Sequence, residues 1–355
     1  MAVDSVRTRT EPRVRARGIP PRWGLCAGAF LVGALAVGIG IGPVGIGFGG
    51  ILESALSHIP FVHVDSPLST VQEAVLWQLR APRVVLAALV GGMLAIAGSA
   101  YQGVFRNPLA DPYLLGVAAG AGLGATIAIA GGLGHGTGQL VPIAAFTGAT
   151  LAVVCAYVLG RSAGAARTTG ALVLAGVTVA AFMTALQTFV QQQRTDSLRD
   201  VYAWLLGGFS TSSWRDVWVA APYVLISSVI LLAHRRILDV LSLGDDEAAS
   251  LGIEVRRTRL LLVAAATLGT AAAVSVSGLI GFVGIIVPHT VRLLVSTSYR
   301  AVVPLSLVVG AGFLVFADVL ARSVLSPAEL PIGVITAFFG APFFAIVLRT
   351  SRSIR

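Results

Sequence analysis

Long apolar runs recur along this chain, and they constrain its fold more than any other feature. Ten stretches of roughly 17 or more mostly apolar residues alternate with polar breaks, and a helix of that length crosses a hydrocarbon core of roughly 30 Å. Backbone groups inside lipid must pair within their own segment, which favours helices. The sequence therefore predicts an all-α polytopic membrane protein with about ten transmembrane helices.

The polar breaks set the expected boundaries. Residues 1–22 hold six arginines, two acids and three prolines, which predicts a disordered basic tail, and residues 23–355 form one transmembrane domain. The polar segment 47–79 is expected to lie outside the membrane, with Thr70 and Glu73 forming a capping box. We expect transmembrane helices at residues 24–46, 84–105, 114–130, 140–159, 171–190, 217–233, 260–276, 279–295, 302–320 and 332–348.

The arginines indicate how these helices cross the membrane. Of the 25 basic residues, all arginine, nineteen fall on the side that holds both termini and six fall on the other side. Cytoplasmic loops carry an excess of basic residues, so both termini are expected to be cytoplasmic in a multi-pass inner-membrane protein. The same bias explains the net charge of +9 without a nucleic-acid partner.

Glycines recur at spacings near four on two of the predicted helices. Such small residues let helices approach closely in a membrane. The glycines concerned are Gly91, Gly92, Gly98, Gly116, Gly120 and Gly124.

A charged stretch at residues 238–259 interrupts the apolar runs. Eight of its 22 residues are charged, so it must be hydrated. Ser242 as a cap, acids in a first turn and Gly252 after the end predict a short helix. We interpret the stretch as a docking surface for a soluble motor.

The chain carries no chemistry that could supply energy for transport. It has no nucleotide-binding glycine-rich motif, no nucleophile with a base and no paired carboxylates. Its predicted spans are almost free of ionisable groups, which argues against an ion-coupled carrier. The clearest exception, Asp318, has Arg322 one turn further on, so a local ion pair is expected. The five histidines are scattered, so neither a metal site nor a cofactor is expected.

From residue 78 onward, the sequence resembles the FecCD family of permease subunits of type II ABC importers. The strings that carry the resemblance are QLRAPRVV at 78–85, YQGVFRNPLADPYLLGVAAGAGLGA at 101–125, LVLAGV at 172–177, WLLGGFS at 204–210, LGDDEAASLG at 243–252, SGLIGFVGIIVPHTVRLL at 277–294 and ADVLARSVLSPAELPIGVITAFFGAPFF at 317–344. The resemblance implies a type II importer permease fold and a homodimer. It also implies a cytoplasmic ABC ATPase dimer and an extracytoplasmic substrate-binding protein as partners.

The resemblance also implies roles for residues on the two sides of the membrane. Arg80, Arg83 and Arg322 would meet acidic residues of the binding protein, although interfacial charges whose stems snorkel along the membrane would look the same. Asn107 and Leu109 would form one layer of a cytoplasmic gate, or an ordinary turn at Pro108. The second layer would hold Thr168 and Thr169, followed by Gly170 where a hydroxyl is expected.

Two further sets of residues follow from the match. A polar stripe on the helix at 171–190 would line the pathway or hydrogen-bond between helices: Thr184, Gln187, Thr188 and Gln191. The coupling helix that fits into the ATPase would contain Asp245, Asp246, Glu247, Ala248, Leu251 and Gly252.

The leading hypothesis is a permease subunit of an ATP-driven importer of iron-siderophore complexes. The alternatives are a haem or cobalamin importer of the same family, or an ion-coupled secondary transporter. A membrane-embedded enzyme or receptor is disfavoured because no catalytic constellation is present.

Overall fold

The regular secondary structure in the described part of the chain is entirely helical, as backbone pairing in lipid requires. The computed structural model describes residues 18–42, 44–59, 66–133, 140–162 and 169–352, and no strand occurs within those ranges. The apolar helices are α1 (Pro21–Gly40), α4 (Ala81–Phe105), α5 (Val117–Ala130), α6 (Leu140–Ser162), α7 (Thr169–Gln193), α9 (Trp214–Ala233), α12 (Val255–Ser277), α13 (Val283–Leu294), α14 (Tyr299–Ser323) and α15 (Ile332–Arg352). Between them lie α2 (Phe48–Ser57), α3 (Thr70–Ala74), α8 (Leu198–Leu205), α10 (Arg235–Leu241) and α11 (Asp245–Ser250).

Each predicted span corresponds to one apolar helix, but not every helix is a full span. Among the described residues, seven helices are long and apolar enough to cross a membrane. The other three are shorter: α5, α13 and the apolar part of α15, which ends at Val347. Within its described residues the structure therefore has an apolar helix at each of the ten predicted positions, and three of the ten have shorter apolar runs. Most of the predicted tail, residues 1–17, lies outside the described residues, and its last two residues begin α1.

One difference between the predicted and observed spans lies between α12 and α13. A helix was expected from residue 279, yet it begins only at Val283, because Gly278 and Phe282 both adopt positive φ, +69° each. The Tyr113 hydroxyl donates to the Ile280 carbonyl (2.9 Å) and accepts from the Ile280 N–H (3.1 Å). Non-helical backbone at membrane depth is tolerated where protein groups pair it in this way.

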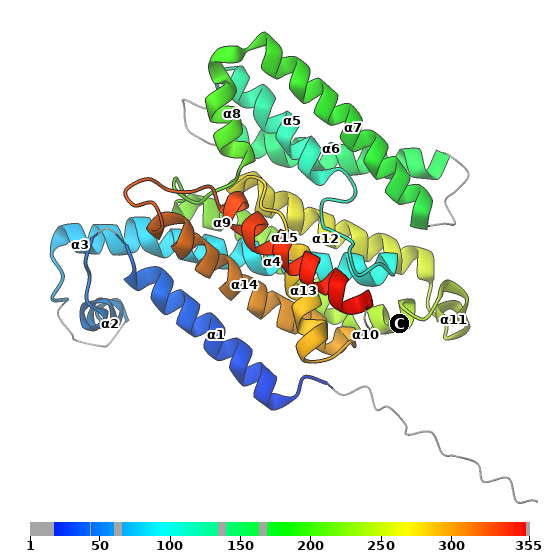
Figure 1. The fold of residues 1–355 in the computed structure, drawn as a ribbon, viewed down its shortest axis with the longest axis horizontal. Helices are drawn as coiled ribbons and strands as arrows, with labels where there is room; N and C mark the ends of the chain where they lie inside the picture. Colours follow the sequence, from blue (N-terminus) through cyan, green and yellow to red (C-terminus); the bar gives the residue numbers. More distant parts are fainter. Residues whose placement is uncertain (1–17, 43, 60–65, 134–139, 163–168, 353–355) are drawn as a thin grey trace, which may run out of the picture.

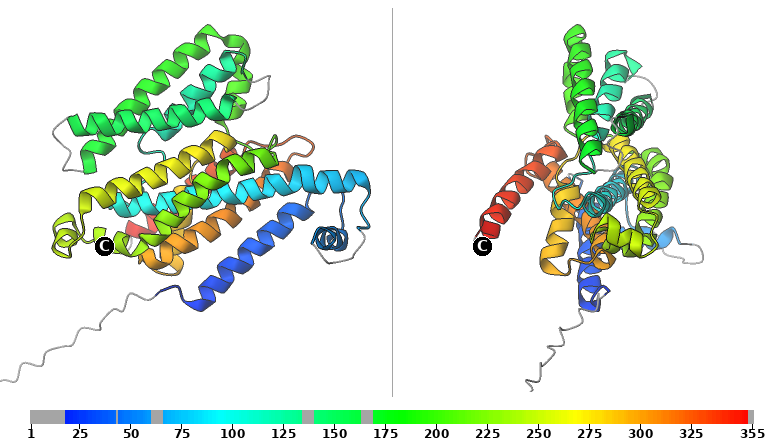
Figure 2. Two further views of the ribbon diagram at one scale, coloured as in Figure 1. Left: turned by 180° about the vertical axis from the view of Figure 1, so that it is seen from behind. Right: turned by 90° about the vertical axis from the view of Figure 1, so that its right-hand side faces the viewer.

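Helix α4 is the central element of the larger group of helices. It packs against α9, α12, α13 and α14, and α1 covers α14 from outside (Figures 1 and 2). A Cβ on Gly98 would lie 1.9 Å from the carbonyl oxygen of Gly284 on α13, so only glycine allows this approach. The predicted packing role is thus confirmed for Gly98, whereas Gly116 precedes α5 with φ +84° and serves the turn instead.

Helices α5, α6, α7 and α8 form a second group, drawn at the top of Figure 1. A Cβ on Gly120 would lie 2.2 Å from the Gly148 carbonyl oxygen, which explains how closely α5 and α6 pack. Helix α12 contacts α5 and α6 as well as α4, and so joins the two groups. Only one side of α7 is covered by these neighbours, and Phe182 and Phe189 on it are exposed.

Segment 47–79 contains more structure than the sequence suggested. Helix α3, a π-helical stretch (Val75–Arg80) and α4 form one continuous helix from Thr70 to Phe105. Its N-cap is Ser69, whose hydroxyl accepts from the Gln72 N–H (3.3 Å), so the predicted Thr70–Glu73 capping box was one residue off.

Candidate functional site

One end of the molecule holds a cluster of arginines paired with the buried Asp318 and the exposed Glu329. The Arg83 guanidinium donates to both carboxylate oxygens of Asp318 on α14 (2.8–3.0 Å) and to both oxygens of Glu329 in the loop after α14 (2.8 and 3.0 Å). Asp318 is fully buried, so an unpaired charge there would be strongly destabilising. Arg322 adds the predicted i,i+4 ion pair to Asp318 at 3.5 Å, which the structure confirms. The sequence did not predict that Arg83 is also a partner of Asp318.

The other two arginines of the cluster, Arg80 and Arg322, contact the C-terminal end of α1 and the residues just after it. Arg80 donates to the carbonyls of Ile39 (3.1 Å), Gly40 (3.2 Å) and Val44, and Arg322 donates to the carbonyl of Gly38. The last carbonyls of a helix lack intrahelical partners and carry the negative end of its dipole, so they attract cations. Arg80 and Arg322 are buried, at 4% and 8% exposed. Arg80, Arg83 and Arg322, which the resemblance groups, lie at one end of the molecule with their side chains bound to partners within this chain. Their contact with a binding protein stays a prediction.

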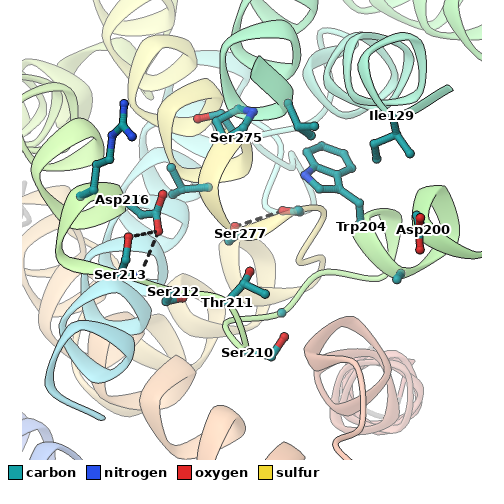
Figure 3. A pocket seen from close by; sticks show the side chains of 17 residues that line it. Ile129, Asp200, Trp204, Ser210, Thr211, Ser212, Ser213, Asp216, Ser275 and Ser277 are labelled. Carbon is teal, nitrogen blue, oxygen red and sulfur yellow. Dashed lines mark hydrogen bonds between the residues drawn. The ribbon is translucent and has the colours of Figure 1, made fainter. Parts of the chain in front are cut away.

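A hydroxyl-lined cleft lies at the same end of the molecule. Trp214 at the start of α9 donates to the carbonyl of Trp77 (2.7 Å), which places this end of α9 beside the arginine cluster. The cleft measures about 780 Å³ (Figure 3). Asp216 in its wall accepts from the hydroxyl (2.8 Å) and the N–H (2.9 Å) of Ser213. Its polar lining includes Asp200, Trp204, Ser210, Thr211, Ser212, Ser213, Arg215, Asp216, Ser275 and Ser277.

Sequence reasoning missed this cleft because its walls come from α5, α6, α8, α9, α12 and the loop after α8. The only available signal was the run of four hydroxyl residues at 210–213, which by itself is typical of a loop.

The charged segment 238–259 lies about 35 Å away along α4, because Arg83 and Arg106 are separated by most of that helix. Its short helix α11 begins at Asp245 and is anchored by Ala248, which is fully buried. Gly252 has φ +82°, and the N–H of Ile253 donates to the Ala248 carbonyl, so the predicted glycine-based end is confirmed. The predicted Ser242 cap is wrong: its hydroxyl donates to the Asp239 carbonyl, and the N-cap is Gly244.

Two acids and two leucines of this segment are exposed, whereas a third acid is paired with arginines. Asp245 pairs with Arg259 (2.7 Å) and Arg106 (3.4 Å). Asp246 and Glu247 are exposed, as are Leu243 (66%) and Leu251 (65%). The outward face of α11 therefore combines acids with two uncovered leucines.

The residues predicted as a gate lie in the turn after α4. The side-chain oxygen of Asn107 accepts from the Leu109 N–H (2.9 Å), which forms a tight local turn, and Leu109 is 53% exposed. Of the second predicted layer, Thr168 lies outside the described residues and Thr169 is the first residue of α7. The structure thus positions Asn107 and Leu109, and the second layer of the gate stays a prediction.

The polar stripe on α7 is divided between two environments. Gln187 is buried against Gly122 of α5, whereas Thr184 and Thr188 are exposed. The Thr188 hydroxyl donates to the Thr184 carbonyl (3.0 Å), within the same helix. Gln191 is partly buried. Of the four residues of the stripe, the two threonines are thus exposed, Gln191 is intermediate and Gln187 is buried.

Known proteins share this architecture and much of this sequence. The model of the FecCD transport family matches residues 30–350. The chain is 40% identical over 304 residues to an uncharacterised ABC transporter permease protein of Bacillus subtilis, covering 85% of this chain and 82% of the relative. It is 38% identical to the cobalamin import system permease protein of Halobacterium salinarum, covering 92% and 95%. It is also 38% identical to a probable iron chelatin transport system permease protein of Helicobacter pylori, covering 83% and 87%.

A solved structure agrees with the fold as well. An ABC transporter assigned to the metal-chelate type, in an inward-facing conformation, superimposes with a TM-score of 0.81 at 29% identity, covering 93% of this chain and all of that one. This chain therefore belongs to the FecCD transport family and is a multi-pass, non-catalytic permease subunit of an ABC transporter.

Proposed function

We propose that this chain forms the translocation pathway of an ATP-driven importer of iron-siderophore complexes. The observation that carries the coupling part of the proposal is the surface of α11. Leu243 and Leu251 are uncovered beside Asp246 and Glu247, while buried Ala248 and paired Asp245 hold the helix to the bundle. A rigid helix with an apolar and acidic outer face suits a cleft in a partner ATPase dimer. Hydrolysis would then be performed by that partner.

The outer end is proposed to receive an extracytoplasmic substrate-binding protein. Of the three arginines, Arg83 is the one that also pairs with Glu329, and the Glu329 side chain is 37% exposed. Arg80 and Arg322 would act indirectly, because they fix the end of α1 beside this surface. This arrangement requires the outer end to be extracytoplasmic and both termini to be cytoplasmic, in line with the arginine bias.

A second copy of the chain is the proposed partner for the uncovered helices. Phe182 and Phe189 on α7 and Phe338 on α15 are exposed, and no described element of this chain covers them. Two copies facing each other through α7 and α15 would enclose a pathway lined by Thr184, Thr188 and Gln191. Lipid would cover the remaining apolar faces.

Asn107 and Leu109 are proposed as part of the cytoplasmic gate, with Thr168 and Thr169 as its second layer. A gate of this kind excludes water with an apolar plug. Replacing Leu109 by serine should raise solute leak through complexes reconstituted without ATP. A pore as tight as the wild type would remove Leu109 from the gate.

The ligand is assigned to the iron-chelate class because the superimposed transporter is of the metal-chelate type. A cobalamin importer is the second candidate, because the relative from Halobacterium salinarum matches over nearly the full length of both chains. Uptake of ⁵⁵Fe-siderophore by proteoliposomes containing the permease, its ATPase and its binding protein tests the assignment, with ⁵⁷Co-cobalamin as the competing ligand. Uptake of ⁵⁷Co-cobalamin without uptake of ⁵⁵Fe-siderophore would mean that the chain belongs to a cobalamin importer.

A further inference from the structure

A single carboxylate joins the proposed docking helix to two different parts of the bundle. Asp245, the first residue of α11, lies 2.7 Å from Arg259 on α12 and 3.4 Å from Arg106 at the end of α4. The Asp245 side chain is 35% exposed and that of Arg259 only 18%, so the shorter contact is the better shielded one. Arg259 therefore holds the carboxylate in place, and Arg106 is the second element attached to it.

Arg106 is attached directly to the proposed gate. It is the C-cap of α4, with φ +50°, and it is followed immediately by Asn107, Pro108 and Leu109. A positive φ is sparsely populated for a residue with a side chain, so this backbone conformation is fixed by its surroundings. Movement of the Arg106 side chain would thus be passed to the backbone of the turn.

The same turn has a second, independent attachment. The Gln102 side-chain amide donates to the carbonyls of Gly284 on α13 (3.2 Å) and Ala110 (3.4 Å), and its oxygen accepts from Arg292. The turn from 106 to 110 is therefore held to the bundle through Gln102 and to α11 through Arg106. In the described part of the chain, the Asp245–Arg106 contact is the ion pair that connects α11 with this turn.

We propose that the Asp245–Arg106 ion pair is the link by which a displacement of α11 reaches the gate turn at Asn107–Leu109. Arg259 is a positioning residue that keeps Asp245 aimed at Arg106. The inference deepens the proposed coupling function and rests on it. On this proposal, the Asp245–Arg106 ion pair transmits the displacement of α11, beyond what the packing of α11 against the bundle transmits.

A matched ion pair provides the control. Arg300 at the start of α14 lies 3.4 Å from Asp239, and its side chain is 40% exposed, the same length and exposure that Arg106 has in its pair with Asp245. Arg300 also ties the charged segment to the bundle, but its ion pair is with Asp239 rather than with a residue of the turn after α4. Arg106→Gln and Arg300→Gln therefore remove the same charge from ion pairs of the same length, and in each case the aspartate keeps other partners: Arg259 for Asp245, Ser298 and Tyr299 for Asp239.

The experiment uses the complete transporter with its ATPase and binding protein in proteoliposomes. Co-purification of the ATPase, ATP hydrolysis and solute imported per ATP hydrolysed are measured for the wild type, Arg106→Gln, Arg106→Lys and Arg300→Gln. We expect Arg106→Gln to retain ATPase binding and hydrolysis while import per ATP falls about fivefold, the low end of single coupling interactions. Arg106→Lys should recover part of the loss, and Arg300→Gln should match the wild type.

The outcomes separate this inference from the function on which it rests. Wild-type import per ATP in Arg106→Gln, or an equal loss in Arg300→Gln, would overturn the specific link while leaving the ATP-driven importer intact. A wild-type complex that binds no ATPase would instead overturn the proposed function. If Arg106→Gln fails to fold, Arg106→Met gives the same test, since it removes the charge of Arg106 and leaves the Asp245–Arg259 ion pair in place.

Discussion

Arg83 on α4 binds both carboxylate oxygens of Asp318 on α14, although 235 residues separate them in the chain. The two helices are the most extensively packed pair in the larger helix group, and this contact fixes their ends. Glu329, in the loop after α14, is the second carboxylate that pairs with Arg83. The end of the molecule that holds the arginine cluster is thus stabilised by charges within the chain itself.

Removing the buried carboxylate should destabilise the protein severely. Asp318→Ala leaves Arg83 and Arg322 without their shared partner, which costs about 3–5 kcal/mol when such a pair is buried. Thermal unfolding of the detergent-solubilised protein measures the effect. The control is Glu254→Ala, which breaks an exposed ion pair with Arg257 and should cost at most about 1 kcal/mol. Equal losses in both variants would contradict the structural role of Asp318.

Neutralising Glu329 should strengthen docking of the binding protein. Glu329 occupies the Arg83 guanidinium in the undocked chain, so a carboxylate of the binding protein must displace it. Titration of the binding protein onto the transporter in nanodiscs should give a severalfold lower Kd for Glu329→Gln. The gain should disappear in Arg83→Gln/Glu329→Gln. Weaker binding by Glu329→Gln would mean that Glu329 supports the docking surface instead.

Adding one methyl group at the α4–α13 contact should separate these helices. The Cβ of Gly98→Ala would lie 1.9 Å from the Gly284 carbonyl, so backbone must move, and overpacking of this kind costs about 1–3 kcal/mol. Gly28→Ala on α1 is the matched control, because nothing lies within 4 Å of its added Cβ. There alanine should be neutral or stabilising, as its helix propensity exceeds that of glycine. Thermal unfolding of both variants distinguishes the two effects.

The turn after α4 should make stability depend on pH. Burial raises the pKa of Asp111 from 3.8 to about 6, although the N–H of Tyr113 donates to its carboxylate (2.7 Å) and lowers the pKa in part. Between these two pKa values the folded state keeps a proton that the unfolded state has lost. The free energy of unfolding should therefore decrease by up to about 1.4 kcal/mol per pH unit as the pH rises from about 4 to about 6, and then level off.

Asp111→Asn tests that dependence, because it retains an oxygen for the Tyr113 N–H but cannot ionise. Its stability near pH 7.5 should equal or exceed that of the wild type, and the decrease between pH 4 and 6 should shrink. Asp196→Asn, at an exposed acid, should leave the profile unchanged. A wild-type profile in Asp111→Asn would assign the pH dependence to another group.

The sequence predicted best what depends on local pattern. Apolar runs located all ten apolar helices, and the i,i+4 spacing of Asp318 and Arg322 identified their ion pair. The start of α13 was misplaced because apolarity continues through 279–282 while Gly278 and Phe282 leave the helical conformation. The capping residues were shifted because Ser69 and Gly244, rather than Thr70 and Ser242, stand at the N-caps.

Contacts between distant segments could not be predicted in this way. Nothing in the spacing of Arg83 indicates Asp318 or Glu329, and Asp245 and Arg106 meet only because α11 folds back onto the end of α4. The resemblance grouped Arg80, Arg83 and Arg322 as one outer surface, but only the packed structure revealed that α1 and α14 supply their partners.

The central claim is that the chain transports only when a separate ATPase drives it. The most direct test is accumulation of ⁵⁵Fe-siderophore in proteoliposomes that contain the permease alone, with an imposed proton or sodium gradient, or the permease with its ATPase, binding protein and ATP. We predict uphill accumulation only in the complete, ATP-supplied system. Accumulation against a gradient by the permease alone would contradict the claim.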